Sequence, residues 1–484
     1  MKLTVSNQLV TLGELRQAWL EPVRVELGDD ARRRIAESRE LIEDVVAHGD
    51  RVYGVNTGFG QLASVRVGDD ELAHLQENLV RSHAVGVGED LDDNIVRLIM
   101  LMKVIGLAEG FSGVRLELVE GLCDLINNNI YPCIPSRGSV GASGDLAPLA
   151  HMASALIGLG EVRVDGKVVP ALAALEEAGI EPIRLAPKEG LALLNGTQVS
   201  TALALGAVFR TENVLSAALM AGAMSSDAIQ GSDTPFDRRI QNVRGHGGQI
   251  AVASVLRELM QGSDIRASHI DCDRVQDPYC IRCQPQVTGA CLDVLRHVCG
   301  VLETEANAVT DNPLVFTDSR AVLSGGNFHA EPVALAADYL ALAIAEIGAL
   351  SERRIALLID SHLSGLPAFL VEDSGLNSGF MMAQVTAAAL ASENKSHAHP
   401  ASVDSIPTSA NQEDHVSMAT FAARRLHNML DNVADIVAIE LLAAAQGIGF
   451  HRPQTSSPAI EEVIVALREL SPAYEEDRSL SADI

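Results

Sequence analysis

The fold class follows most directly from residues 333–350, which read VALAADYLALAIAEIGAL. Small and branched apolar residues fill this run, and Asp338 and Glu346 are its only charged positions. An α-helix with this pattern is apolar on most of its faces, so it must be buried on most sides. The two charges argue against a membrane span, which requires an almost uncharged run.

Other stretches have the same character and predict further buried helices: 93–109, 190–230, 297–309, 328–358, 378–398 and 415–447. Strand signals are few, and the best is a hairpin in which residues 162–164 and 168–169 flank the turn pair Asp165-Gly166. We therefore expect a mainly α fold with a long central helix bundle and a small mixed α/β N-terminal region. A boundary near residue 187 would divide an N-terminal domain, 1–187, from a helix-bundle domain, 188–484.

Composition excludes several classes of protein. Of the 484 residues 47% are hydrophobic and 21% charged, which excludes intrinsic disorder. The charge is 36 basic minus 64 acidic residues, or −28, so nucleic acid and anionic membranes are unlikely partners. Seven cysteines are an odd number for a disulfide framework, and the N-terminus has no signal-peptide pattern. We expect a soluble cytoplasmic protein with reduced thiols.

Chemistry is concentrated in residues 138–149, GSVGASGDLAPL. Its glycines allow a tight loop, and Asp145 followed by Pro148 predicts an N-cap and a proline in the first helical turn. The simplest interpretation is an anion-binding glycine loop. The segment lacks the Gly-Lys-Ser/Thr ending of a P-loop, and Asp145 stands where a nucleophile elbow needs its last glycine.

A more specific interpretation concerns Ala142-Ser143-Gly144. The amide nitrogen of glycine is unhindered, so in a compressed turn the Gly144 nitrogen can attack the Ala142 carbonyl and close a five-membered ring. Loss of water from the ring and from Ser143 leaves an exocyclic alkene. The product is an electrophile that needs no external cofactor, and the start of a helix favours electron density arriving at it.

This loop resembles that of the aromatic amino acid ammonia-lyases, and the resemblance extends over nearly the whole chain. Further matching blocks are 53–60, 191–198, 276–279, 282–286, 311–314, 324–329 and 409–415. The resemblance implies the helical fold of the fumarase/aspartase-like superfamily. It also implies a 4-methylidene-imidazol-5-one prosthetic group formed from Ala142, Ser143 and Gly144, which captures the substrate amine.

The resemblance also assigns roles to side chains. Tyr53 is the candidate base for the β-proton, provided that positive charge or hydrogen bonding lowers its pKa. Arg282 suits the substrate carboxylate, because its planar fork meets two oxygens at once. Glu413 resembles the acidic residue that faces the imidazole or the leaving amine.

The remaining residues that the resemblance places in the pocket hold or surround the substrate. Asn195 and Gln276 resemble the polar residues that hold the carboxylate or the prosthetic-group carbonyl, and Tyr279 and Phe328 line the pocket. Taken alone, each of these residues is also explained by capping, ion pairing or core packing, and Tyr53 by packing on Phe59.

Substrate choice depends on Ser82-His83. The branch of the family that acts on histidine resembles Ser-His here, whereas tyrosine-specific relatives tend to have His-Leu and phenylalanine-specific ones Phe-Leu. Imidazole needs polar partners in a buried pocket, which His83 and Glu413 can supply. The expected reaction converts L-histidine to urocanate and ammonia. The alternatives are a tyrosine or phenylalanine ammonia-lyase or aminomutase with the same group, and a non-enzymatic structural protein on the same scaffold.

We expect no metal site. Cys272, Cys280 and Cys283 lie near His269, but they contain a single tight pair. His397, His399 and His415 lack the spacing of a helical metal pair, and we interpret them as structural.

The resemblance implies a homotetramer whose active sites draw residues from several subunits, so Tyr53 and the loop need not face each other within one chain. The chain ends at residue 484, somewhat sooner than is usual in the family. No proposed site residue lies there, so we expect the chemistry to be unaffected.

Overall fold

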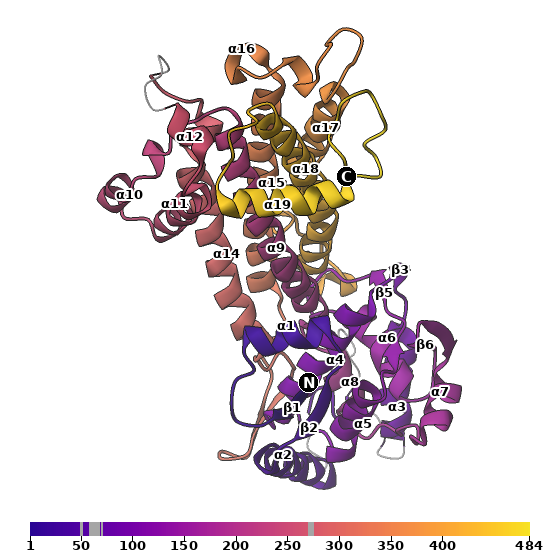
Figure 1. Cartoon of the computed structure of the whole chain (residues 1–484). Helices are drawn as coiled ribbons and strands as arrows, with labels where there is room; N and C mark the ends of the chain where they lie inside the picture. The colour runs from indigo at the N-terminus through magenta and orange to yellow at the C-terminus, as the bar shows by residue number, and fades with distance from the viewer. Residues whose placement is uncertain (49–51, 58–67, 69–70, 270–274) are drawn as a thin grey trace. The chain divides into compact units, whose positions relative to one another are not determined.

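The computed structural model describes residues 1–48, 52–57, 68, 71–269 and 275–484 (Figure 1). It is 61% helix and 8% strand, which confirms the mainly α prediction. The chain forms two compact units, each made of several segments. Unit 1 comprises 1–207, 299–338 and 400–424, and unit 2 comprises 208–298, 339–399 and 425–484. The division expected at residue 187 stays a prediction. The chain passes between the two units at several points, after residues 207, 298, 338, 399 and 424.

Four long helices contain most of those points: α9 (Gln198–Ala228), α14 (Gln284–Ala306), α15 (Glu331–Ile359) and α18 (Ala419–Gly449). By length and composition α9, α15 and α18 are each long and apolar enough to cross a membrane, so the two charges in 333–350 do not by themselves exclude a span. In the protein, 56% of the most apolar window of α9 and 67% of those of α15 and α18 are buried inside the chain itself. Burial in a bundle accounts for the apolar composition.

Unit 1 contains the shorter helices of the N-terminal half. They are α1 (Leu12–Leu20), α2 (Asp29–His48), α3 (Leu72–His83), α4 (Asp93–Ala108), α5 (Leu116–Asn127), α6 (Leu146–Leu156), α7 (Ala171–Ala178) and α8 (Glu189–Leu194). Helix α4 is buried from Ile95 to Ala108, as its largely apolar sequence predicts, and the buried run includes two cations, Arg97 and Lys103. It contacts α5 and α1, while α6 contacts α3 and α8, so the helices that carry the loop and the cavity are held together at the centre of this unit.

Within the described residues, the strands of unit 1 form four small sheets. Parallel β1 (Lys2–Val5) and β2 (Arg24–Leu27) pair, as do antiparallel β3 (Val87–Asp90) with β5 (Pro135–Arg137) and β8 (Leu314–Phe316) with β9 (Ala321–Leu323). The fourth sheet has the order β4 (Tyr131–Pro132), β6 (Glu161–Val164), β7 (Lys167–Pro170). Strands β6 and β7 are the predicted hairpin: Val164 pairs with Lys167. Asp165 and Gly166 have φ of 48° and 73°, as a type I′ turn requires.

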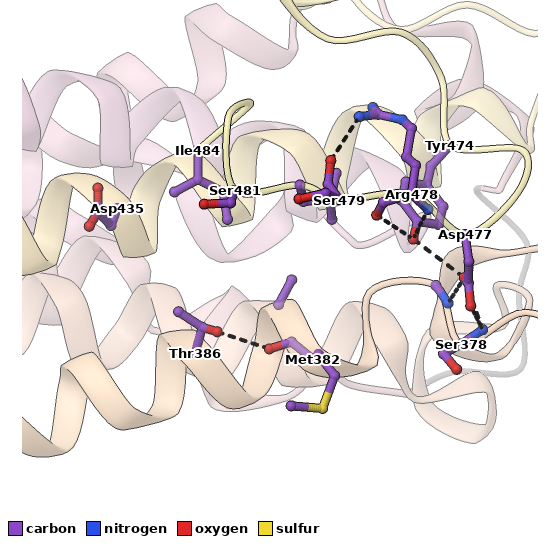
Figure 2. A pocket seen from close by; sticks show the side chains of 13 residues that line it. Ser378, Met382, Thr386, Asp435, Tyr474, Asp477, Arg478, Ser479, Ser481 and Ile484 are labelled. Atoms are coloured by element: carbon purple, nitrogen blue, oxygen red, sulfur yellow. Dashed lines mark hydrogen bonds between the residues drawn. The ribbon is translucent and has the colours of Figure 1, made fainter.

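Unit 2 contains α10 (Arg238–Arg244), α11 (Gly247–Met260), α12 (Asp264–Ser268), α13 (Tyr279–Arg282), α16 (Ser361–Ser364), α17 (Met381–His397) and α19 (Pro458–Leu470). Its core joins the C-terminal part of α9 to α11, α15, α18 and α19 through fully buried side chains such as Met224, Leu256, Leu358 and Ile439. The C-terminal segment lines a cavity of about 700 Å³ in this unit (Figure 2). There Asp477 accepts hydrogen bonds from the backbone nitrogens of Ser378 and Gly379, which ties the segment to the start of α17.

Candidate active site

A cavity of about 1090 Å³ lies within unit 1. Its walls come from the turn at residue 53, α3, the 138–145 loop, α8 and the segments 312–329 and 409–415, which are far apart in sequence. Seven of the predicted site residues line it: Tyr53, His83, Ala142, Ser143, Asn195, Phe328 and Glu413. Folding therefore gathers most of the predicted site within one unit.

The 138–145 loop is constrained where the predicted condensation would occur. Gly141 and Gly144 have φ of 67° and 72°, a region that favours glycine. A Cβ on Gly144 would lie 2.3 Å from the carbonyl oxygen of Gly196, so only glycine fits. The backbone nitrogen of Asp145 donates to the same oxygen at 2.8 Å. The Asn195–Gly196 turn is thus pressed directly against the loop.

Asp145 occupies the N-cap position of α6, as predicted, but its side chain does not cap the helix. Instead its two carboxylate oxygens accept hydrogen bonds from the hydroxyls of Ser139, Ser200 and Thr420 and from the Ser200 nitrogen, at 2.6–3.0 Å. The fully buried carboxylate thereby ties the loop to α9 and α18. The N-cap position is therefore as predicted, but the carboxylate is occupied by these tertiary partners and does not cap the helix.

Ser143 and Glu413 are in direct contact. The Ser143 hydroxyl donates to the Glu413 Oε1 at 2.5 Å, and Thr408 donates to Oε2 at 2.7 Å. Thr408 and Glu413 also pair through their backbones. Glu413 is therefore fixed at the very residue whose hydroxyl the condensation would remove.

His83 lies at the end of α3 and is held by its own helix. Its Nδ1 lies 2.9 Å from the carbonyl oxygen of Leu79 and 3.0 Å from the Ser82 hydroxyl. Burial lowers the pKa of His83, while the Leu79 carbonyl and the charge of Glu413 act in the opposite direction. The ring is therefore neutral near pH 7, and Glu413 is close enough to influence it.

The turn that carries Tyr53 is fixed by α3 and α8. Gln76 donates to the Gly54 carbonyl at 3.4 Å and accepts from the Leu191 nitrogen at 3.2 Å. Tyr53 itself is half-buried and faces the cavity. Phe59, the partner expected if Tyr53 were only a packing residue, lies outside the described residues.

Gln276, Tyr279 and Arg282 belong to unit 2 and do not line this cavity. Gln276 and Tyr279 are exposed, and Arg282 stacks on the Tyr279 ring at 4.5 Å from its centroid. Within the described part of the chain, the Arg282 Nε is a buried atom without a hydrogen-bond partner. These three predicted site residues therefore belong to the other unit of the chain from the loop and the cavity.

His329 and Glu331 were not singled out from the sequence, and His415 was interpreted there as structural. His329 and His415 lie with their rings stacked 5.7 Å apart, and the His329 Nε2 is 3.2 Å from the His415 carbonyl oxygen. With Glu331 they place possible ligand atoms within 4.8 Å of one another, so among the described residues these three could hold a metal ion. The signal was present, since His329 and His415 lie in two of the blocks that carry the family resemblance.

The cysteines have a different environment. Cys280 and Cys283 are free thiols, and Cys272 lies outside the described residues. Burial raises the pKa of Cys123 and of Cys291 to about 12. These two thiols are protonated at neutral pH and chemically inert.

The loop fits the prosthetic group that the resemblance implies. Gly196 leaves no room for a side chain at position 144. Ala142 is buried and the adjacent Ser143 is half-buried. Asn195 donates through Nδ2 to the Ser143 carbonyl at 2.7 Å, and its Oδ1 is a buried atom with no partner among the described residues. Gly144 is thus packed closely against Gly196, and Ser143 is hydrogen-bonded at the carbonyl that the ring would retain.

The fold and this cavity define an aromatic amino acid lyase. The chain belongs to the aromatic amino acid lyase family, whose model matches residues 10–469, and its helical architecture is that of the fumarase/aspartase-like superfamily.

Particular members are closely similar. Histidine ammonia-lyase of Vibrio cholerae is 58% identical over 485 residues, covering 100% of this chain and 95% of that protein. The crystal structure of histidine ammonia-lyase from Trypanosoma cruzi matches with a TM-score of 0.92 at 44% identity, over 100% of this chain and 92% of that one. Tyrosine aminomutase from Streptomyces globisporus matches with a TM-score of 0.94 at 37% identity, over 100% and 95%. Overall shape therefore does not separate these activities, and side chains in the cavity must.

Proposed function

We propose that this protein is a carbon–nitrogen lyase that eliminates ammonia from L-histidine to give urocanate. The observation that carries the proposal is the convergence of the Ala142-Ser143-Gly144 loop with His83 and Glu413 in one cavity. The similarity to histidine ammonia-lyases supports the same substrate. A phenyl ring could exchange no hydrogen bond with His83 or Glu413, whereas an imidazole can do so with both.

When formed, the methylidene-imidazolone supplies an electrophile for the substrate amine. The chain's own residues do the rest. Asn195 holds the Ser143 carbonyl, and its hydrogen bond to that oxygen is stronger when negative charge develops there. Tyr53 takes the β-proton, and Phe328 provides an apolar wall for the substrate.

Glu413 and His83 act on the imidazole side. His83 is neutral at pH 7, so it can exchange one hydrogen bond with the substrate ring without placing a second charge beside it. Glu413 contributes a carboxylate that accepts a hydrogen bond from the imidazole or the leaving amine. The breakage of a weakly acidic C–H bond thus relies on positioned groups rather than on water.

The substrate carboxylate is held by Arg282, with Gln276 and Tyr279 beside it, supplied by another subunit of a cytoplasmic homotetramer. The Arg282 guanidinium suits this role because it offers parallel donors to two oxygens. Its buried Nε atom, which has no partner among the described residues, supports a role in binding a ligand or a neighbouring subunit.

The test combines intact mass with substrate turnover. Active wild-type protein is expected to be two waters lighter than the translated chain, and Ser143→Ala to lack that deficit and lose activity. L-histidine should be the best substrate among histidine, tyrosine and phenylalanine. Active protein of full translated mass would refute the electrophile, and faster turnover of tyrosine or phenylalanine would favour the alternative lyases or aminomutases. An inert protein of full mass would favour the structural role.

A further inference from the structure

Lys103 is a cation in the interior of an apolar helix. It lies on α4, is 2% exposed, and is one of five lysines in the chain. Its ammonium group donates to the carbonyl oxygens of Ala192 at 3.2 Å and of Asn195 at 2.8 Å. These carbonyls belong to the last turn and the C-cap of α8, where oxygens lack helical partners and carry the negative end of the helix dipole.

Keeping a charge here is costly. Burial lowers the pKa of Lys103 to about 7, although the carboxylates of Asp311 and Asp145 favour its charged form. Asp311 is engaged with another cation, because the Lys188 ammonium donates to it at 2.6 Å. Desolvating an ammonium costs several kcal/mol, and neutral carbonyls compensate only in part. An apolar side chain of similar length would avoid this cost, so packing alone does not explain the lysine.

The turn that Lys103 holds is the one pressed against the loop. Asn195 donates to the carbonyl of Ser143 at 2.7 Å, and Gly196 accepts from the Asp145 nitrogen at 2.8 Å. The Gly196 oxygen also lies 2.3 Å from the position that a Cβ on Gly144 would take. Two residues of the turn therefore contact three consecutive residues of the loop, and Lys103 contacts the turn through the Asn195 carbonyl, beside the amide that binds Ser143.

We infer that Lys103 is a positioning residue for the condensation of the loop: its ammonium group fixes the Ala192–Gly196 turn, and that turn compresses Ala142-Ser143-Gly144. The inference rests on the proposed function and adds a residue to it.

In the condensation the Gly144 nitrogen bonds to the Ala142 carbonyl carbon, and the Ala142 oxygen leaves as water with the hydrogens of the Gly144 and Ser143 nitrogens. The second water takes the Ser143 hydroxyl and its Cα hydrogen. No oxidant or reductant is required. Both losses depend on loop geometry that the turn supplies.

The experiment follows water loss directly in Lys103→Met, which keeps the length of the side chain and removes its charge and donors. Protein is synthesised in a cell-free system, samples are stopped at intervals, and the folded fraction is weighed intact. We expect Lys103→Met to lose its waters roughly a hundredfold more slowly than wild type, the effect of misplacing a reacting group by about 1 Å. Lys103→Arg, which restores charge and donors, should recover a large part of the rate.

Arg354→Met is the matched control for general destabilisation. It also removes a buried cation, but one that pairs with Glu440 in unit 2. We expect it to lower the melting temperature and to leave water loss at the wild-type rate. Equal slowing in Arg354→Met would show that any destabilisation delays condensation and would overturn the inference.

Lys103→Gln covers the case in which Lys103→Met does not fold, because it retains amide donors while removing the charge. It should lie between Met and wild type in rate. If Lys103→Met or Lys103→Gln loses water at the wild-type rate, the inference is wrong. A two-water deficit in the wild-type protein would still support the proposed function in that case. Active wild type without any deficit would instead refute the proposed function itself.

Discussion

Single side chains determine which amino acid this cavity accepts. His83 is held by Leu79 and Ser82 on its own helix, so its orientation does not depend on substrate. We predict that His83→Leu lowers kcat/KM for L-histidine by about tenfold to two-hundredfold, the effect of about 1–3 kcal/mol, because the imidazole loses a polar partner. Relative turnover of phenylalanine should rise.

His74→Leu is the control for this substitution. It makes the same exchange on the exposed side of α3, away from the cavity lining, and should leave both kinetic constants unchanged. If His83→Leu also leaves kcat/KM for histidine unchanged, the assignment of histidine through this residue is wrong.

The lowered pKa of His83 gives a pH dependence whose sign is fixed. Because the pKa in the folded chain lies below the reference value of 6.5, the unfolded chain binds the proton first as pH falls. The free energy of unfolding therefore decreases as pH drops from 6.5 towards the lowered pKa. Above pH 6.5 His83 is neutral in both states and causes no such loss of stability. Urea denaturation above and below this value should show a smaller loss in His83→Leu than in wild type. An equal loss in both proteins would contradict the shift.

The buried thiols give a second prediction at this scale. Since burial raises the pKa of Cys123 and Cys291 to about 12, almost no thiolate exists at mildly alkaline pH. Iodoacetamide applied to native protein should leave both cysteines unmodified in peptide maps, whereas protein unfolded in urea should be alkylated at both. Rapid labelling of either in the native protein would show that the site opens.

Among helices, a polar network joins α9, α15 and α18 in unit 2. Glu440 on α18 is fully buried, and its carboxylate accepts hydrogen bonds from the Arg354 guanidinium and from the hydroxyls of Ser225 and Ser351. Arg354→Met should reduce the free energy of unfolding by about 3–5 kcal/mol, because it leaves a buried carboxylate without its cation. The double variant Arg354→Met with Glu440→Leu should recover much of that loss. Denaturant titration tests this, and additive losses would refute the coupling.

Elements differ in how far the sequence determines them. The β6–β7 hairpin was predictable because Asp165-Gly166 requires positive φ at both positions and alternating valines flank it. The role of Asp145 was not, since a local rule assigns the carboxylate to its own helix while Ser200 and Thr420 approach from distant segments. Lys103 left a signal, a lysine within an apolar helix, but its partners lie in α8 and its C-cap, about ninety residues later.

At the scale of the whole molecule, the resemblance supplied the names of the site residues and folding supplied their grouping. Tyr53, Ser143 and Glu413 reach one cavity because unit 1 draws on three separate segments of chain, a division that no composition change marks. The boundary expected near residue 187 came from the change from a hairpin to long apolar helices, and it stays a prediction. The sequence also left open where Arg282 acts, because a pattern within one chain contains no information about its copies.

Complementation between subunits tests the predicted sharing of sites. Tyr53 lies in unit 1 and Arg282 in unit 2, and in a tetramer with shared sites they would serve the same substrate from different chains. Tyr53→Phe and Arg282→Met should each be nearly inactive as homotetramers. Coexpressed with separate tags and purified as mixed tetramers, they should regain roughly a quarter of wild-type activity, since random assembly gives that fraction of sites both native residues. If one chain supplied both residues, every site in the mixture would contain a substitution and activity would stay at background.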